Sequence, residues 1–205
     1  MPKAKIGFGR AFSNLFYNDY RYSVMSRLER EDTMNLTLRT VRQDELADFK
    51  KEMQRAFQLG AEAEYGETEK QILPEADIDR SLGAKGAIAY AAVIDDEIVG
   101  GAIVVINEQT QHNHLDFLFV KVGVQSKGIG QAIWSEIERL HPDTKVWETC
   151  TPYFEKRNIH FYINRCGFHA VEFYNPKHPD PHESGKPDMD SDDVGCMFRF
   201  EKIME

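Results

Sequence analysis

The stretch 115–140, LDFLFVKVGVQSKGIGQAIWSEIERL, decides the expected fold, and its centre is Gln125-Ser126-Lys127-Gly128-Ile129-Gly130. It begins with an apolar, β-prone run. It ends with a segment in which Ile133, Ile137 and Leu140 recur at helical spacing. We therefore expect a strand, a glycine-containing turn and a helix, in that order.

Such a turn is suited to binding an anion. The first turn of a helix presents backbone N–H groups without an internal partner, and these groups favour negative charge. Gly128 and Gly130 lack a Cβ, so a phosphate could approach the main chain, and Lys127 supplies a positive charge. The alternative is an ordinary strand-to-helix turn that contains two glycines.

Two common phosphate loops are excluded by spacing, because neither the Walker pattern nor the dinucleotide pattern Gly-x-Gly-x-x-Gly is present. The segment resembles instead the acyl-CoA-binding motif of the GNAT N-acetyltransferase superfamily, Gln/Arg-x-x-Gly-x-Gly/Ala. Here this motif reads Gln125, Gly128 and Gly130. A second segment, 157–168 (RNIHFYINRCGF), is similar to the superfamily's Asn-containing turn followed by a helix that ends in Gly-Phe. The resemblance covers about residues 35–205.

The resemblance implies an α/β (α+β) GNAT-like fold with a central mixed, splayed sheet of about seven strands flanked by helices. Residue patterns predict a hairpin around the turn Asp95-Asp96 and a C-terminal helix cap at Gly167. Strands are expected at 35–42, 87–94, 97–106, 112–120, 145–150, 170–174 and 196–203, and helices at 43–59, 74–82, 131–140 and 155–166.

Composition limits the function classes. The formal net charge of −9 argues against nucleic-acid binding, which relies on Lys and Arg. Three cysteines form no spaced metal or redox pair and fit a reducing cytoplasm. The longest apolar run, 98–106, is too short to span a membrane, so we expect a cytoplasmic protein without a membrane partner.

We expect two parts in the chain, an N-terminal extension at 1–34 and an acetyltransferase domain at 35–205. The extension is rich in aromatic residues and Arg. It either packs on the domain or a partner subunit, or caps the substrate groove. The insert 176–194 is acidic and Pro-rich and is expected to be a loop, with no metal site. The sequence leaves open whether the chain forms a homodimer.

The resemblance implies that acetyl-CoA is the co-substrate. Its pantetheine would pair with a strand edge as an added strand does. Its pyrophosphate would lie on the amides that follow Gln125. The residues expected to bind the cofactor are Phe119, Val120, Val122, Gln125, Ser126, Lys127, Gly128, Ile129, Gly130, Gln131 and Asn158, the last displaced from its usual family spacing.

The catalytic candidates follow from the same resemblance. His114 falls at the strand position where histone-type relatives carry a general-base Glu, it shares a strand face with Asp116, and Glu148 is a second candidate. The alternative for His114 is a surface histidine at a strand start. Tyr162 is the candidate acid, although the usual Tyr position is Ile163, and one residue turns a side chain by about 100°. Either Tyr162 still reaches the sulfur, or it packs in the core and water protonates the thiolate.

The leading hypothesis is an N-acetyltransferase that moves an acetyl group from acetyl-CoA to a primary amine of a small molecule or exposed peptide by direct attack. The alternative is a non-catalytic acyl-CoA-binding sensor or interaction module. The sequence does not identify the amine.

Overall fold

A computed structural model describes residues 35–67, 69, 71–124, 128–181 and 196–205. The chain divides into two units, Met1–Asn35 and Leu36–Glu205, and all the described helices and strands belong to the second. The expected extension 1–34 lies outside the described residues, as does most of the expected insert 176–194. In the part of the chain that is described, no helix is long and apolar enough to cross a membrane.

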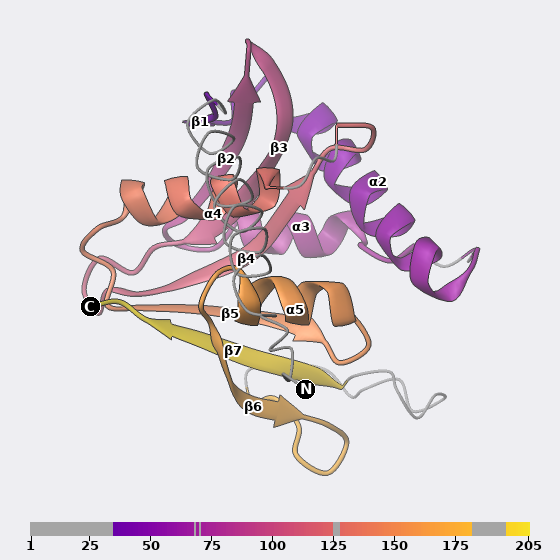
Figure 1. Cartoon of the computed structure of the whole chain (residues 1–205), viewed down its shortest axis with the longest axis vertical. Coiled ribbons are helices and arrows are strands. Elements are labelled where there is room, and N and C mark those ends of the chain that lie inside the picture. Colours follow the sequence, from indigo (N-terminus) through magenta and orange to yellow (C-terminus); the bar gives the residue numbers. More distant parts are fainter. Residues whose placement is uncertain (1–34, 68, 70, 125–127, 182–195) are drawn as a thin grey trace, which may run out of the picture. The chain divides into compact units, whose positions relative to one another are not determined.

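The unit contains one seven-stranded sheet with helices on both sides (Figure 1). In chain order the elements are β1 (Thr37–Thr40), α2 (Leu46–Tyr65), α3 (Glu75–Leu82), β2 (Ala87–Ile94), β3 (Glu97–Val105), β4 (His112–Val120), α4 (Ile129–Leu140), β5 (Val146–Pro152), α5 (Lys156–Asn164), β6 (His169–Tyr174) and β7 (Met197–Ile203). The expected order of strands and helices is confirmed along the whole described unit.

The sheet is mixed and open, with the strand order β1-β2-β3-β4-β5-β7-β6. Neighbouring strands are antiparallel except β4 and β5, which are parallel. A parallel pair needs a crossover, and α4 supplies it between these two strands. The last strand, β7, inserts between β5 and β6, so the chain's C-terminal segment becomes an interior part of the sheet.

The parallel pair β4 and β5 separates soon after it forms. Only three residue pairs are in register, from His112 opposite Val146 to His114 opposite Glu148. Both strands continue well beyond that point, to Val120 and Pro152. The expected splayed sheet is therefore confirmed, and the opening between the diverging strands begins directly after His114.

A tight hairpin joins β2 and β3. Asp95 and Asp96 both have positive φ angles, 49° and 65°, as a type I′ turn requires at its two central residues. Asp tolerates this left-handed conformation better than most residues, and the type I′ turn matches the twist of the flanking strands. The local sequence thus explains the predicted hairpin.

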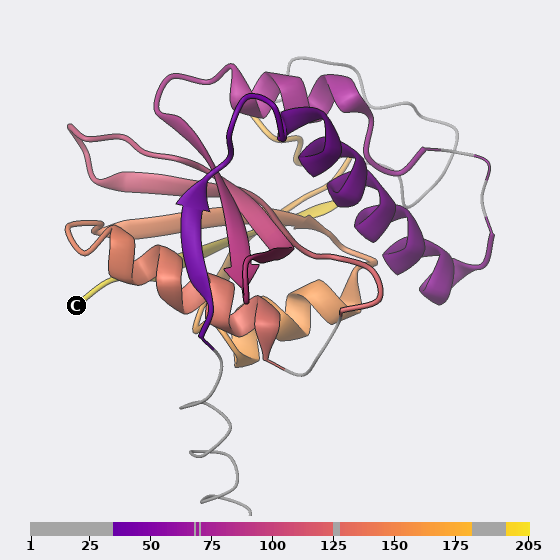
Figure 2. The same cartoon turned by 90° about the horizontal axis from the view of Figure 1, so that it is seen from above.

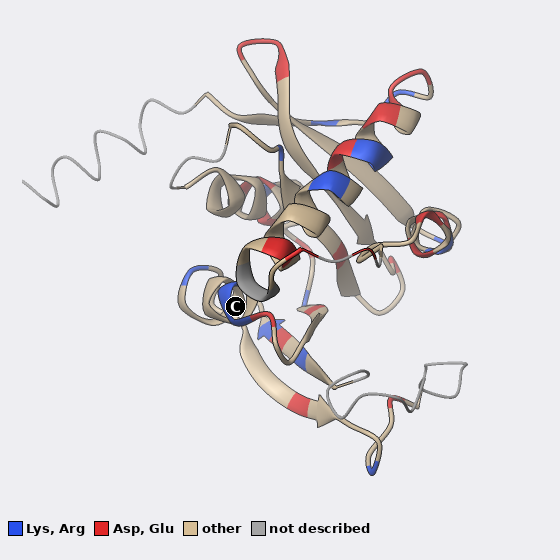
Figure 3. Cartoon of the chain, turned by 90° about the vertical axis from the view of Figure 1, so that its right-hand side faces the viewer, with Lys and Arg blue, Asp and Glu red and all other residues tan. Residues whose placement is uncertain are grey.

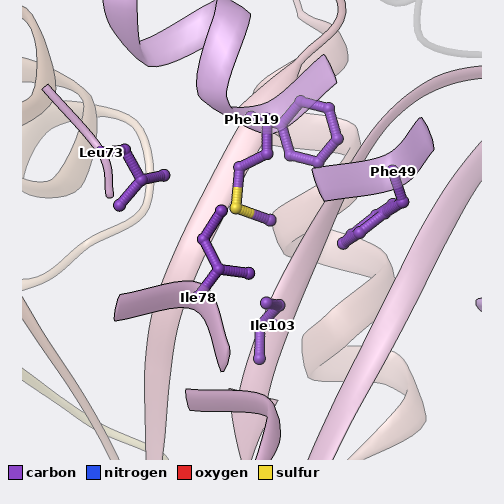
Figure 4. Packing of buried hydrophobic residues seen from close by; sticks show 6 residues of the cluster. Phe49, Leu73, Ile78, Ile103 and Phe119 are labelled. Atoms are coloured by element: carbon purple, nitrogen blue, oxygen red, sulfur yellow. The ribbon is translucent and has the colours of Figure 1, made fainter. Parts of the chain in front are cut away.

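One face of the sheet is covered by α2 and α3 (Figure 2). The apolar positions of these helices join β3 and β4 in one buried core, and Figure 4 shows its labelled side chains pointing toward one another. The Phe49 ring lies edge-on to Phe119, with ring centroids 5.2 Å apart. Gly101 of β3 makes this approach possible, because a Cβ there would lie 2.4 Å from the Phe49 ring. The core cluster is Phe49, Met53, Leu73, Ile78, Ile103 and Phe119.

The opposite face is covered by α4 and α5 (Figure 2). Trp134 of α4 meets Trp147 of β5 edge-on at 5.3 Å between centroids, and both rings are buried. Tyr162 of α5 packs on Phe200 of β7 at 5.8 Å. Because successive strand residues face opposite sides, Trp147 on this face places Glu148 on the α2–α3 face.

An irregularity in β4 changes which residues share a face. The ladder with β3 pairs Leu115 and Phe117 with consecutive β3 residues and leaves Asp116 without a partner. Such a bulge bends the strand and interrupts the alternation. As a result the Asp116 carboxylate accepts a hydrogen bond from Ser81 of α3, and the next residue, Phe117, packs on Phe57 of α2 at 6.0 Å.

Among the boundaries that differ from expectation are the C-terminal ends of α2 and α5. Helix α2 continues to Tyr65, whereas the sequence predicts an end near residue 59, where Gly60 lowers local helix preference. The helix continues because the residues after Gly60, such as Ala61, Glu62 and Ala63, are good helix formers. The helix ends instead at Gly66, whose φ is 88°. The prediction of Gly167 as the cap of α5 is wrong, since the cap is Arg165, but Gly167 does adopt the left-handed φ of 79°.

Candidate active site

The opening between β4 and β5 is fixed at its narrow end by a side chain. Thr149 is fully buried, and its hydroxyl donates to the carbonyl oxygen of Leu115 at 2.8 Å. The Leu115 carbonyl of β4 is thus hydrogen-bonded by a side chain, at the point where the backbone pairing of β4 with β5 stops. Beyond it, no further residue pair of β4 and β5 is in register, which is the geometry in which an extended ligand pairs with a strand edge.

On the α2–α3 face, His114 lies between two carboxylates at this narrow end. Its Nδ1 is 2.5 Å from Asp116 Oδ1, and its Nε2 is 3.6 Å from Glu148 Oε1. The second Asp116 oxygen accepts the hydrogen bond from Ser81, which fixes the carboxylate. The structure therefore brings together three of the four predicted catalytic residues, His114, Asp116 and Glu148.

The charges of this group follow from its contacts. Burial alone would lower the pKa of His114, but interactions with Asp116, Cys150 and Glu148 outweigh it and raise the pKa to about 11. The pKa of Glu148 falls to about 2, chiefly because the His114 imidazolium lies beside it and also because of Arg199. At neutral pH His114 is therefore an imidazolium and Glu148 a carboxylate.

Arg199 of β7 connects this group to the far end of the sheet. Its Nη1 donates to Glu148 Oε2 at 2.9 Å and to Glu201 Oε1 at 2.5 Å, and its Nη2 donates to Glu172 Oε2 at 3.2 Å. The carboxylates hold the pKa of Arg199 above its usual value, although burial opposes them. We call His114, Asp116, Glu148 and Arg199 the His114 cluster.

The N-terminal end of α4, residues 128–131, forms the other part of the candidate site. Gly128 is the N-cap with a φ of 119°, a conformation that favours glycine, and no acidic residue lies in the first turn. The amides of Ile129, Gly130 and Gln131 therefore lie at the positive end of the helix dipole. No acidic side chain in that turn competes with an anion for them. The predicted Gln125, Ser126 and Lys127 lie outside the described residues.

Gly130 lies where α4 packs against α5 and the end of β4. A Cβ at this position would lie 3.4 Å from the Phe161 ring of α5 and 3.8 Å from Val120 Cγ2. These are ordinary van der Waals distances, so the space around Gly130 would accept an alanine. Packing therefore does not by itself require a glycine here.

The remaining predicted cofactor residues differ in burial and in whether they lie on the β4 edge. Phe119 is buried in the core, so only its backbone is available to a ligand. Val120 ends β4, whereas Val122 lies in the following turn and not on the strand edge. Asn158 is half-buried in the first turn of α5.

Tyr162 lies on the opposite face of the sheet from the His114 cluster. It packs against Phe168 and Phe200, and burial raises its pKa to about 12 despite an opposing hydrogen bond with Thr149. Its neighbour Ile163 is 39% exposed and points away from the core. Tyr162 thus hydrogen-bonds to Thr149, which lies at the narrow end of the opening, from the face of the sheet that α4 and α5 cover.

Three residues of this region were not singled out from the sequence: Ser81, Cys150 and Arg199. The strand alternation after Glu148 was a usable signal for Cys150, since residues two apart share a face. No local signal was available for the other two, because Ser81 and Arg199 reach the cluster through α3 packing and the pairing of β7 with β5.

Two sets of side chains have atoms of the types that bind metals within 4.8 Å of one another: His114, Glu148 and Cys150, and His112, Glu148 and Glu201. Ion pairs already account for this closeness, because Glu148 is paired with His114, His112 and Arg199. The expectation that the domain uses no metal stays a prediction.

Outside the His114 cluster, Lys and Arg are interspersed with Asp and Glu along the described chain (Figure 3).

Sequence comparison identifies relatives of this chain. Residues 46–168 match the Acetyltransferase (GNAT) family. The chain is also 45% identical over 175 residues to the uncharacterized protein YrkN of Bacillus subtilis (strain 168), which covers 82% of this chain and 93% of that protein.

Solved structures with a similar fold share little sequence with this chain. The ribosomal-protein-S18-alanine N-acetyltransferase of Escherichia coli has a TM-score of 0.60 at 12% identity and covers 83% of this chain and 94% of that one. The PaiA N-acetyltransferase of Thermoplasma acidophilum, solved with coenzyme A, has a TM-score of 0.58 at 17% identity and covers 83% and 100%. The spermidine N-acetyltransferase of Vibrio cholerae, solved with CoA and spermine, has a TM-score of 0.57 at 12% identity and covers 82% and 95%.

Proposed function

The chain belongs to the GNAT acetyltransferase family and is an acyltransferase, and on that premise we propose that it transfers acetyl from acetyl-CoA to a primary amine of a small molecule or exposed peptide. Family membership favours this catalytic interpretation over a non-catalytic acyl-CoA sensor. The observation that carries the proposal is the opening between β4 and β5, with the His114 cluster on one face and the α4 end beside it.

The α4 end and the β4 edge would hold the donor. The pyrophosphate lies on the amides that follow Gly128, where the helix dipole favours an anion. The pantetheine runs along the end of β4 and pairs with the backbone of Phe119 and Val120. The thioester then reaches the narrow end of the opening, next to Thr149.

The His114 cluster would receive the amine on the α2–α3 face. An ammonium group is attracted by the carboxylates of Asp116 and Glu148, and must lose a proton before its nitrogen can attack the thioester carbon. His114 accepts that proton only after its own proton has left. Its side chain is 36% exposed, so water can take that proton away. The rate of transfer should therefore rise with pH.

Tyr162 is the proposed acid for the leaving thiolate. Its raised pKa keeps the hydroxyl protonated at neutral pH, and its partner Thr149 marks the narrow end of the opening. The proposed base and acid then lie on opposite faces of the sheet. The amine would enter from one face, and the sulfur would be protonated from the other.

The cytoplasm is the proposed location, because Cys150, Cys166 and Cys196 are all free and fit a reducing compartment. The proposed acceptor remains an amine class and not a single compound. A homodimer and a cap formed by residues 1–34 stay hypotheses.

The proposal is tested by incubating the purified chain with acetyl-CoA and a panel of small amines and peptides, while free CoA thiol and acetylated products are measured. We expect amine-dependent thiol release. The Glu148→Gln variant should lose on the order of 100-fold or more in kcat/KM for the amine, because it removes a carboxylate that attracts the ammonium, and should still bind CoA. Tight CoA binding without amine-dependent thiol release would favour the sensor.

A further inference from the structure

Cys150 lies where the opening between β4 and β5 begins. It is the fifth residue of β5, follows the bridging Thr149, and shares a strand face with Glu148. It is half-buried, whereas Cys166 and Cys196 are only 3% and 8% exposed. Burial also raises the pKa of the Cys166 thiol to about 12. Of the three thiols, only Cys150 faces the candidate active site with partial exposure.

The surroundings of Cys150 resemble those of a nucleophilic thiol. The Cys150 Sγ, a His114 ring nitrogen and a Glu148 oxygen all lie within 4.8 Å of one another. His114 is in turn oriented by Asp116 at 2.5 Å through Nδ1. A nucleophile beside a base, with the base oriented by a carboxylate, is the arrangement that activates cysteine.

The charges around Cys150 include a second cation. Arg199 lies directly opposite Cys150 in the β5–β7 ladder, so the two side chains share a face at close range. Its Nε is buried and has no hydrogen-bond partner among the described residues. The negative charge of Glu148 is nearby, but Arg199 pairs with it at 2.9 Å. The imidazolium of His114 and the guanidinium of Arg199 therefore place two cations on the face of the sheet that carries the Cys150 sulfur.

We propose that Cys150 is a second acetyl acceptor of this opening, which takes the acetyl group from acetyl-CoA when no amine is bound. The Cys150 sulfur bonds to the acetyl carbon and the bond from that carbon to the CoA sulfur breaks, while the His114 imidazolium gives its proton to the departing CoA thiolate and takes the Cys150 proton in its place. The product is an acetyl thioester on Cys150 and free CoA. One thioester replaces another, so no oxidant or further reactant is needed.

This inference rests on the proposed function for its donor, acetyl-CoA, but not for its acceptor. Because the step exchanges one thioester for another, excess CoA should reverse it and re-form acetyl-CoA. An acetyl group on Cys150 would lie beside His114 and Glu148, where the amine is proposed to bind. Amine and Cys150 should therefore compete for the acetyl group.

The test is to incubate the full chain with acetyl-CoA without an amine, quench in acid and map acetylated peptides by mass spectrometry. We expect acetyl on Cys150, none on Cys166 or Cys196 in the same sample, and release of up to one CoA per chain. The acetyl should disappear after excess CoA is added and decrease when an accepted amine is present. Cys150→Ala and Cys150→Ser should abolish the acetyl thioester. The Asp116→Asn variant should slow its formation.

Absence of acetyl on Cys150 in wild-type chain that acetylates an amine would overturn the inference and leave the proposed function standing. Equal acetylation of all three cysteines would also overturn it, because the chemistry would then be non-selective. Conversely, acetyl on Cys150 in a chain that acetylates none of the amines would support the inference while contradicting the amine acceptor. Thermal stabilisation by CoA checks that each variant is folded.

Discussion

The α4 end and the His114 cluster lie along the same opening but are assembled from the sequence in different ways. The α4 end uses consecutive residues, from Gly128 to Gln131, in one helix turn. The His114 cluster uses side chains from β4, β5 and β7, and Ser81 of α3 orients one of them. A local segment can therefore bind the donor, whereas the acid–base chemistry depends on the correct pairing of distant strands.

The difference also appears in the electrostatics. At the α4 end, positive potential comes from backbone amides, whose charge does not change with pH. In the His114 cluster, the charge depends on titratable side chains that hold one another in ionised form. Donor binding should then vary little with pH across the range in which His114 titrates, while acetyl transfer should vary strongly.

The largest expected effect is on donor binding. Gly128→Glu places a carboxylate at the N-cap of α4 and should abolish thermal stabilisation by CoA, which is about 2.7 kcal/mol when CoA is present at roughly 100 times its Kd. Gly128→Ala is the matched control, because it has the same backbone strain at a φ of 119° without the added charge. Unchanged stabilisation of Gly128→Glu by CoA would refute the pyrophosphate site.

An intermediate effect is expected on the pH dependence of acetyl transfer. The raised pKa of His114, about 11, means that kcat/KM should increase as pH rises and the imidazolium loses its proton. Asp116→Asn removes a negative partner, lowers the His114 pKa and should move this increase to lower pH. The profile of kcat/KM for one acceptor and an NMR titration of His114 measure the shift.

The control for that experiment is Asp79→Asn, which removes a carboxylate of α3 that pairs with Lys50 away from the His114 cluster. It should leave the position of the pH profile unchanged. Coincident profiles for Asp116→Asn and wild type would remove His114 as the proton acceptor.

The smallest effect is expected at Gly130. Gly130→Ala adds a Cβ 3.4 Å from the Phe161 ring, a contact that a small ring movement relieves, while Ala improves helix preference by about 0.5–1 kcal/mol. The free energy of unfolding should change by less than about 1 kcal/mol, and CoA affinity should be nearly preserved. Denaturant unfolding and CoA titration measure these quantities. A large loss of CoA affinity would show that Gly130, like Gly128, is needed for phosphate approach.

Much of the fold followed from local patterns. The strand β4 was predicted with its observed bounds, and the Asp95-Asp96 hairpin was correct because its turn type depends on those two residues alone. The end of α2 was wrong because the helix continues past Gly60, where local preference predicted its end. The bulge at Asp116 could not be predicted, since it exists only in the register between β3 and β4.

The sequence by itself determined the strand, turn and helix around Gly128, because hydrophobic periodicity and glycine conformation act within a few residues. It also placed His114, Asp116 and Glu148 on their strands. Only the tertiary structure decided that these three side chains meet, that Ser81 and Arg199 hold them, and that Cys150 faces them while Tyr162 lies on the other side of the sheet. The reason is that cross-strand neighbours are set by register, and register depends on long-range packing and not on local sequence.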